Sequence, residues 1–135
     1  MTATTVHLVR HGEVENPEKV LYGRLPGFVL SERGLAMADL VAKAFLDSGA
    51  DITYLVSSPL ERAQQTIAPL AAGLGLAPVI DVRVIEAENA LEGRKVAGGG
   101  LRALLAPSSA RHLYNPFLPS WGEPFTQQRD RMFEA

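Results

Sequence analysis

Two short polar segments contain the residue types that phosphoryl chemistry uses. The first is Arg10-His11-Gly12, and the second ends at Arg62; each follows an apolar run. If both runs are parallel strands, their carboxyl ends bring these side chains to one edge of a sheet. Guanidinium groups hold phosphoryl oxygens through paired N–H donors, and a neutral imidazole nitrogen is a nucleophile. The two segments therefore predict an oxyanion site with a nucleophilic histidine inside it.

The apolar runs indicate the strands that would position these residues. Short runs rich in β-branched and aliphatic residues predict three strands, at 5–9, 52–56 and 78–82. Helical periodicity between the runs gives the order β-α-β-α-β. This order is typical of an α/β fold with a mostly parallel sheet between helix layers, a three-layer α/β/α architecture. Ligands are then expected outside the carboxyl ends of the strands.

Capping residues mark the ends of the two predicted helices. Ser31 is a suitable N-cap and Gly49 a suitable C-cap for a helix at 32–47. Pro59 is expected in the first turn of the second helix, which Gly73 and Gly75 should close. The second helix thus starts just before Arg62 and adds backbone N–H donors to the oxyanion site.

Residues that break regular structure dominate the region from 98 to 122. At most one short helix is expected there, at 101–106. Four aromatic residues argue against simple disorder, so we interpret 97–125 as an ordered flap: Tyr114, Phe117, Trp121 and Phe125. The last segment, 126–135, is predicted to be helical.

The composition excludes several classes of function. The 135 residues include 13 Lys and Arg and 15 Asp and Glu, for a formal charge of −2. This balance, without a run of basic residues, offers no footprint for nucleic acid or an anionic membrane. The sequence shows neither a transmembrane span nor a secretory signal, and it has no cysteine. We expect one cytoplasmic domain that uses no disulfide and no thiolate metal site.

The motifs resemble those of the histidine phosphatase superfamily, also called the phosphoglycerate mutase-like family. The first hallmark of that family is Arg-His-Gly after the first strand, which here is Arg10-His11-Gly12. The segment Leu30-Ser31-Glu32-Arg33-Gly34 is similar to the family's entry into its first helix. The second hallmark, Ser-Ser-x-x-x-Arg-Ala-x-x-Thr, is matched from Ser57 to Thr66. The resemblance covers nearly the whole chain and implies a phosphoglycerate mutase-like fold.

The resemblance also implies a role for individual residues. His11 would be phosphorylated, and four residues would contact the phosphate: Arg10, Asn16, Gly23 and Arg62. The position of Glu86 matches the acid that protonates the leaving oxygen, with Glu88 and Glu92 as open alternatives. No metal or organic cofactor is required for this chemistry. Arg24 is interpreted as surface charge that could meet an anionic group of the substrate.

The family pattern contains a second pocket histidine that this sequence lacks. In the family, that histidine follows a later strand, whereas His112 follows a polar stretch and His7 lies within the first run. We therefore expect 1–135 to be one incomplete domain, without the C-terminal part of the family fold, that self-associates and is a weak catalyst or none. The predicted ligand is a small phosphomonoester or phosphate. Three functions are open: a phosphomonoester hydrolase, a mutase-type phosphotransferase, and a non-catalytic phospholigand-binding module.

Overall fold

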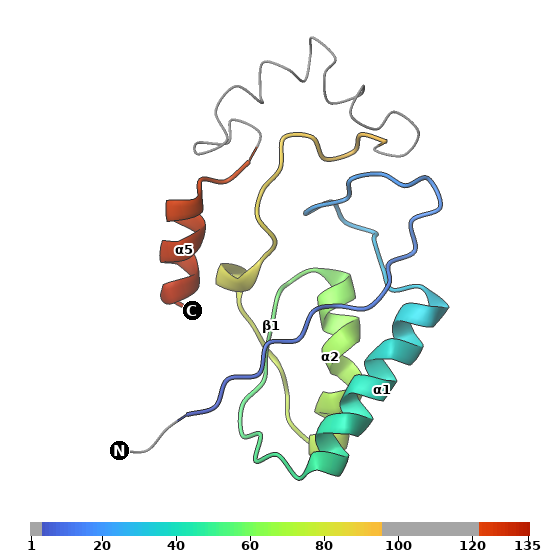
Figure 1. Ribbon diagram of the computed structural model, residues 1–135, viewed down its shortest axis with the longest axis vertical. Helices are drawn as coiled ribbons and strands as arrows, with labels where there is room; N and C mark the ends of the chain where they lie inside the picture. Colours follow the sequence, from blue (N-terminus) through green and yellow to red (C-terminus); the bar gives the residue numbers. More distant parts are fainter. Residues whose placement is uncertain (1–3, 96–121) are drawn as a thin grey trace.

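The computed structural model describes residues 4–95 and 122–135, and between residues 32 and 80 its elements follow the predicted alternation of helix and strand (Figure 1). The elements are α1 Glu32–Ser48, β1 Val56–Ser57, α2 Glu61–Leu74, β2 Val79–Ile80, the 3-10 helix η1 Val82–Val84 and α5 Phe125–Phe133. The predicted helix at 101–106 and most of the predicted flap at 97–125 lie outside the described residues. The predicted C-terminal helix at 126–135 corresponds to α5.

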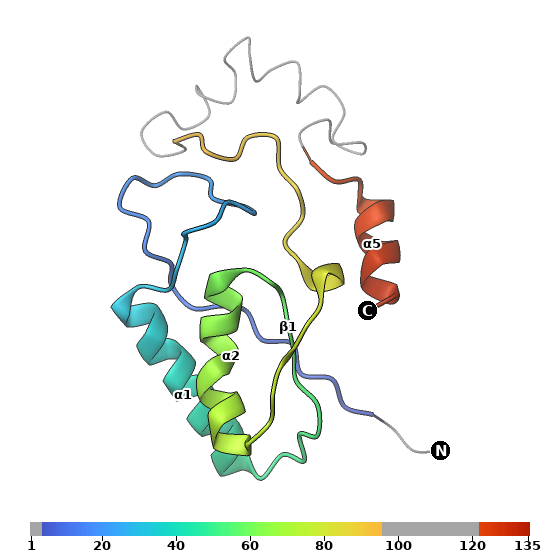
Figure 2. The same cartoon turned by 180° about the vertical axis from the view of Figure 1, so that it is seen from behind.

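Helix α1 has the caps that the sequence predicts. The Ser31 side chain accepts a hydrogen bond from the backbone N–H of Gly34 at 3.1 Å. At the other end, Gly49 adopts φ 66°, a left-handed conformation that glycine allows without strain. Ala38 and Ala42 are buried on this helix. Small side chains there allow close packing of α1 on α2, and Figures 1 and 2 show the two helices side by side.

Helix α2 differs from its prediction at both ends. Pro59 precedes the N-cap residue Leu60 and so lies outside the first turn. Gly73 does not end the helix, which continues to Leu74 and is capped by Gly75 at φ 66°. A Cβ on Gly73 would lie 2.5 Å from a methyl carbon of Leu46 on α1. Gly73 therefore serves the contact between the helices, while Gly75 provides the turn.

The two strands are parallel, as predicted, but short. Val56 pairs with Val79 and Ser57 with Ile80. The backbone N–H of Val79 donates to Leu55 O, and that of Asp81 donates to Ser57 O, both at 2.9 Å. Beyond β2 the Asp81 carboxylate caps η1 by accepting the N–H of Arg83 at 2.8 Å, which ends the strand before residue 82.

The prediction of a buried strand at 5–9 is wrong for this structure. These residues form no strand, and Val6 and Leu8 are 75% and 89% exposed. The physical reason is that an extended segment becomes a strand only beside a partner, and no described segment pairs with this one. Within this segment, the ring of His7 contacts the ring of Phe45 on α1, with the two ring centroids 5.1 Å apart.

The core lies between the two long helices and the strand pair. Buried aliphatic residues from α1, α2 and the position just before β1 form it, with partly buried neighbours at its rim: Ala42, Leu55, Leu70 and Ala71, with Phe45, Ile52, Ile67, Leu74 and Leu76 around them. In both views α5 lies beside η1, on the far side of the strands from α1 and α2 (Figures 1 and 2). The fold is therefore α/β with a parallel strand pair. Within the described ranges, no helix is long and apolar enough to cross a membrane.

Candidate active site

The loop that follows His11 returns to the start of α1, and two glycines allow the close approach. A Cβ on Gly12 would lie 2.6 Å from Gly34 O, and one on Gly34 would lie 2.0 Å from Glu13 O. The N–H of Ser31 donates to Glu13 O at 2.9 Å, next to the bridge between Val14 and Leu30. The backbone at His11 is thus fixed against the N-terminal end of α1 by contacts that any side chain would block.

The His11 ring has a defined hydrogen-bonding arrangement. Its Nδ1 lies 2.8 Å from the carbonyl oxygen of Gly12. Because a carbonyl oxygen only accepts, Nδ1 carries the proton in the neutral ring and Nε2 carries the lone pair. The half-buried ring meets Tyr22 edge to face, with centroids 6.5 Å apart. Nε2 is therefore the nitrogen available to act as a nucleophile.

Arg62 is the largest fully buried side chain of the described residues, with 1% of its surface exposed. Its Nη2 donates to Gly23 O at 2.6 Å, and its guanidinium carbon lies 4.8 Å from the centre of the Tyr22 ring. The N–H at Nε is buried and has no acceptor among the described residues. A buried cationic donor of this kind is suited to an anionic oxygen.

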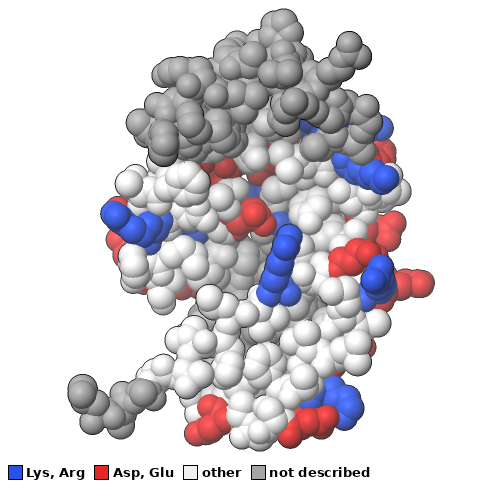
Figure 3. Space-filling view, viewed as in Figure 1, with Lys and Arg blue, Asp and Glu red and all other residues white. Residues whose placement is uncertain are grey.

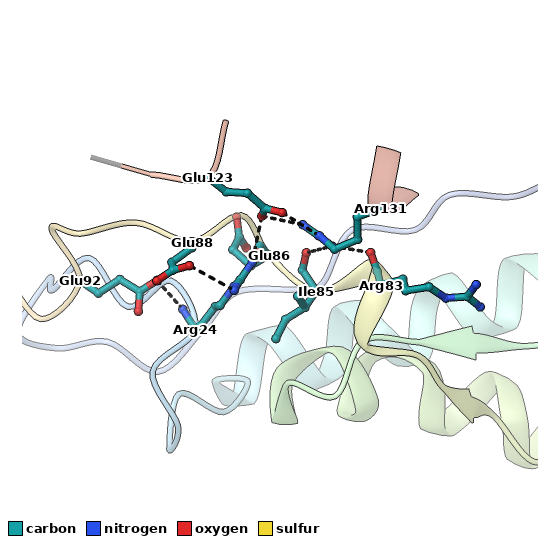
Figure 4. Close-up of polar contacts among 8 residues, drawn as sticks. All are labelled: Arg24, Arg83, Ile85, Glu86, Glu88, Glu92, Glu123 and Arg131. Atoms are coloured by element: carbon teal, nitrogen blue, oxygen red, sulfur yellow. Dashed lines mark hydrogen bonds and ion pairs between the residues drawn. The ribbon is translucent and has the colours of Figure 1, made fainter. Parts of the chain in front are cut away.

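The three candidate acids differ in what they face. Glu86 places its Oε2 3.6 Å from Arg62 Nη2, and half of its side chain is exposed. Glu88 instead lies 3.8 Å from Nη1 of Arg24, and Glu92 accepts the backbone N–H of Arg24 at 2.9 Å (Figure 4). Of the three acids, Glu86 is the one that lies beside the buried arginine.

Arg62 contacts two other predicted site residues, Gly23 and Glu86, and Tyr22 links it to a third, His11. Gly23 contributes its carbonyl oxygen, and at φ 39° a Cβ there would meet the Glu92 carboxylate at 2.0 Å. No contact joins the other two predicted phosphate ligands, Arg10 and Asn16, to this group within the described residues.

Arg10 and Asn16 have different surroundings. Arg10 is exposed and forms no ion pair with another described residue. Asn16 closes its own loop, since its Nδ2 donates to Val20 O at 2.9 Å and its Oδ1 accepts the Val20 N–H at 3.0 Å. Asn16 thus shapes the loop between His11 and Tyr22.

Two further residues of the site were not anticipated. Tyr22 contacts both His11 and Arg62 and stacks on Phe28 with centroids 5.2 Å apart. Arg24 was interpreted as surface charge, but only 28% of its side chain is exposed, and it binds the backbone oxygen of Glu86 at 2.6 Å. The only signal for either was adjacency to Gly23 in the sequence. In the described ranges, no group of three or more His, Asp or Glu side chains is arranged to hold a metal ion.

Comparisons with known proteins identify the family of the chain. The family model described as histidine phosphatase superfamily (branch 1) matches residues 6–135. The chain is 52% identical over 132 residues to "Uncharacterized protein Rv0525" of Mycobacterium tuberculosis, covering 98% of this chain and 64% of that protein. It is 39% identical over 93 residues to "Probable phosphoglycerate mutase GpmB" of Yersinia pestis, covering 67% of this chain and 42% of that protein.

Solved structures show the same fold. The alpha-ribazole phosphatase of Shigella flexneri has a TM-score of 0.66 at 25% identity, with 93% of this chain and 62% of that chain covered. The mycobacterial glucosyl-3-phosphoglycerate phosphatase Rv2419c, in complex with inorganic phosphate, has a TM-score of 0.69 at 23% identity, with 92% and 56% covered. The chain thus spans less than two thirds of each of these relatives. Because the family model matches nearly the whole of this chain, the chain belongs to the histidine phosphatase superfamily.

Proposed function

We propose that the protein is a phosphomonoester hydrolase that works through a phosphohistidine on His11. The observation that carries the proposal is that Tyr22 contacts both a buried Arg62, whose Nε–H has no acceptor among the described residues, and a histidine whose Nδ1 is the protonated nitrogen, which leaves the lone pair on Nε2. A guanidinium held this way suits the equatorial oxygens of a phosphoryl group. Tyr22 contacts both side chains and so links the proposed nucleophile to the cation.

The reaction proceeds in two displacements. In the first, Nε2 of His11 attacks phosphorus, the ester P–O bond breaks, and protonated Glu86 gives its proton to the leaving alkoxide. In the second, water attacks the phosphohistidine, Glu86 takes the proton from that water, and the P–N bond breaks to release phosphate. Arg62, together with Arg10, the exposed residue that precedes His11 in the sequence, stabilises the charge on the transferring group.

The relatives support hydrolysis of a small phosphomonoester, and one of them supports a second candidate. Two structural neighbours are phosphatases by name, one of them in complex with inorganic phosphate. The Yersinia pestis relative carries the name of a phosphoglycerate mutase. A mutase would pass the phosphoryl group from His11 to a second substrate hydroxyl instead of water. Both candidates share the first displacement and differ in the acceptor of the second.

Phosphorylation of the full-length protein tests the shared step. After incubation with a phosphodonor, we expect phosphate on the protein that is labile to acid and stable to base. His11→Ala should abolish this label, whereas His7→Ala, a matched change four residues earlier on an exposed segment, should retain it. A label that persists in His11→Ala would overturn the assignment.

Turnover separates the candidates. We expect p-nitrophenyl phosphate to be hydrolysed in the presence of a chelator. Phosphate transfer to an added alcohol in preference to water would favour the mutase. Binding of phosphate with neither labelling nor turnover would leave a phospholigand-binding module.

A further inference from the structure

A buried carboxylate joins two arginines next to Glu86. Only 4% of the Glu123 side chain is exposed. Its Oε2 accepts from Nη2 of Arg24 at 2.9 Å and from Nη2 of Arg131 at 2.8 Å, and its Oε1 accepts from Nε of Arg131 at 2.9 Å. We call these three residues the Glu123 clasp. Arg24 belongs to the loop after His11, Glu123 precedes α5, and Arg131 lies on α5, so the clasp joins distant parts of the chain (Figure 4).

The two arginines of the clasp also bind the backbone on both sides of Glu86. Nη1 of Arg131 donates to Ile85 O at 3.0 Å and to Arg83 O. Nε of Arg24 donates to Glu86 O at 2.6 Å. The carbonyl groups of the peptide units before and after the Glu86 Cα are therefore both held by guanidinium groups. These donors fix the direction in which the Glu86 side chain leaves the backbone.

The segment that carries Glu86 needs such support. Between the end of η1 and residue 95 it forms no helix or strand, so no ladder of backbone hydrogen bonds fixes it. Two backbone contacts with the C-terminal segment help: the Asn89–Gly122 bridge, and the N–H of Glu123, which donates to Glu88 O at 3.0 Å. Both contacts lie on the C-terminal side of Glu86, whereas the clasp acts at Glu86 itself.

We propose that Arg24, Glu123 and Arg131 are positioning residues that hold the Glu86 carboxyl beside Arg62, where it meets the leaving oxygen. The inference rests on the proposed function, in which Glu86 is the proton donor. Arg24 and Arg131 act through the backbone carbonyls on either side of the Glu86 Cα, and Glu123 acts by holding the two arginines. Proton transfer demands hydrogen-bond geometry, so a shift of the donor by about 1 Å is enough to slow it strongly.

The charges in the clasp keep it assembled at neutral pH. The hydrogen bond from Arg131 holds the pKa of the Glu123 carboxyl below its usual value, and attraction to Arg131 and Arg24 acts in the same direction against the effect of burial. Glu123 therefore stays anionic, and both arginines keep their acceptor.

A double-mutant cycle in the full-length protein tests the inference. Glu123→Gln keeps the size of the side chain but cannot pair with two cations. On glycerol phosphate, whose alkoxide is a poor leaving group, we expect kcat to fall about tenfold with KM unchanged. On p-nitrophenyl phosphate, whose leaving group needs no proton, we expect little loss of kcat. In a Glu86→Gln background, Glu123→Gln should add no further loss, because the group it positions is gone. The matched control is Arg129→Gln, also on α5, where an exposed arginine pairs with Asp130; it should behave as the parent does.

The possible outcomes separate the inference from the proposed function. The inference is overturned if Glu123→Gln lowers kcat by the same factor on glycerol phosphate and on p-nitrophenyl phosphate. It is also overturned if Glu123→Gln lowers kcat by the same factor in the parent and in the Glu86→Gln background. Either result would mean that the clasp has only a structural role. If Glu86→Gln itself spares glycerol phosphate hydrolysis, the donor assignment fails and the inference fails with it. Should Glu123→Gln not fold, Arg24→Gln provides the same cycle, since it removes the donor to Glu86 O while leaving the Arg131–Glu123 pair.

Discussion

At the residue scale, the site depends on a cation that the fold removes from water. Arg62 has 1% exposure, one hydrogen bond to a neutral carbonyl, and a carboxylate partner at 3.6 Å that is itself half exposed. Burying a charge is costly unless it is paired and hydrogen-bonded, and these contacts satisfy the guanidinium only in part. An anion that accepts a hydrogen bond from the Nε–H of Arg62 would satisfy the remaining buried donor. The folded protein should consequently be stabilised by the ligand its site is built to hold.

Inorganic phosphate should stabilise the protein through Arg62. At a phosphate concentration 100 times Kd, linkage predicts about 2.7 kcal/mol of added stability. The urea midpoint should rise with phosphate in the parent protein and stay constant in Arg62→Gln, at matched ionic strength. Arg33→Gln is the control, because Arg33 is 79% exposed and pairs only loosely with Glu13. An equal rise in the Arg62 variant would place the phosphate elsewhere.

Sequence motifs pointed to the proposed reactive residues but not to the residues that hold them. His11 and Arg62 were identified because each occupies a fixed place in a short motif next to a predicted strand. The partners of Arg24 could not be identified in that way, because Glu123 lies 99 residues away and the contact depends on the tertiary fold. The contacts that Tyr22 makes with His11 and Arg62 arise in the same way, from the path of the loop that Asn16 closes.

At the element scale, the placement of His11 depends on how closely α1 approaches the loop before it. Gly12 and Gly34 are both buried, and each would collide with backbone if it carried a Cβ. Backbone atoms cannot move aside as a flexible side chain can. The glycine in the helix-entry motif is therefore a requirement of packing between the loop and α1, which in turn fixes His11, the proposed nucleophile.

Substitution of two helix glycines should have opposite consequences. Gly34→Ala should lower the free energy of unfolding by about 1–3 kcal/mol, as overpacking does, and reduce turnover because His11 shifts. Gly73→Ala meets only the tip of Leu46, a flexible side chain, and gains up to about 1 kcal/mol of helix propensity. Urea unfolding and turnover of both variants provide the comparison. Equal losses of stability and turnover in the two variants would show that the close approach of Gly12 and Gly34 is not required.

The attachment of α5 should be sensitive to acid. Because Arg131 and Arg24 lower the folded-state pKa of Glu123 below about 4.5, its ordinary value, the carboxylate stabilises the fold fully above that pH. This stability is lost as the pH falls from 4.5 through the lower folded-state value. Glu123→Gln should therefore be less stable than the parent at pH 7, and the difference in urea midpoint should shrink below pH 4.5. A difference that stays constant with pH would exclude this linkage.

The helices were predicted more accurately than the strands, and the reason is physical. Both ends of α1 follow from local signals that act within a few residues: Ser31 caps its start, and the left-handed Gly49 ends it after Ser48. A strand forms only with its neighbours, so the apolar run at 5–9 could not by itself become one. The run at 52–56 contributes only its last residue to β1, where Val79 is available to pair.

At the scale of the whole molecule, charge and apolar surface are distributed differently. Figure 3 shows charges of both signs interspersed over one face, without a large area of one sign in its described part. The strand pair, by contrast, exposes aliphatic side chains: Val56 is 39% exposed, Val79 42% and Ile80 47%. Among the described residues, β1 and β2 pair only with each other. Each strand therefore keeps one edge with unpaired backbone groups next to apolar side chains, which favours pairing with another chain.

We expect the 1–135 polypeptide to self-associate through this edge. Sedimentation velocity should show the average mass rising with concentration in the micromolar range. Ile80→Lys should shift the protein toward monomer, since a lysine on an edge strand opposes strand addition. Leu40→Lys is the matched control: Leu40 is also exposed, at 68%, but lies on α1, away from the strands. If hydrophobicity alone drove association, both lysines would act alike, whereas edge pairing predicts that only the β2 substitution does. A parent polypeptide that stays monomeric over the whole concentration range would show that the exposed edge does not pair.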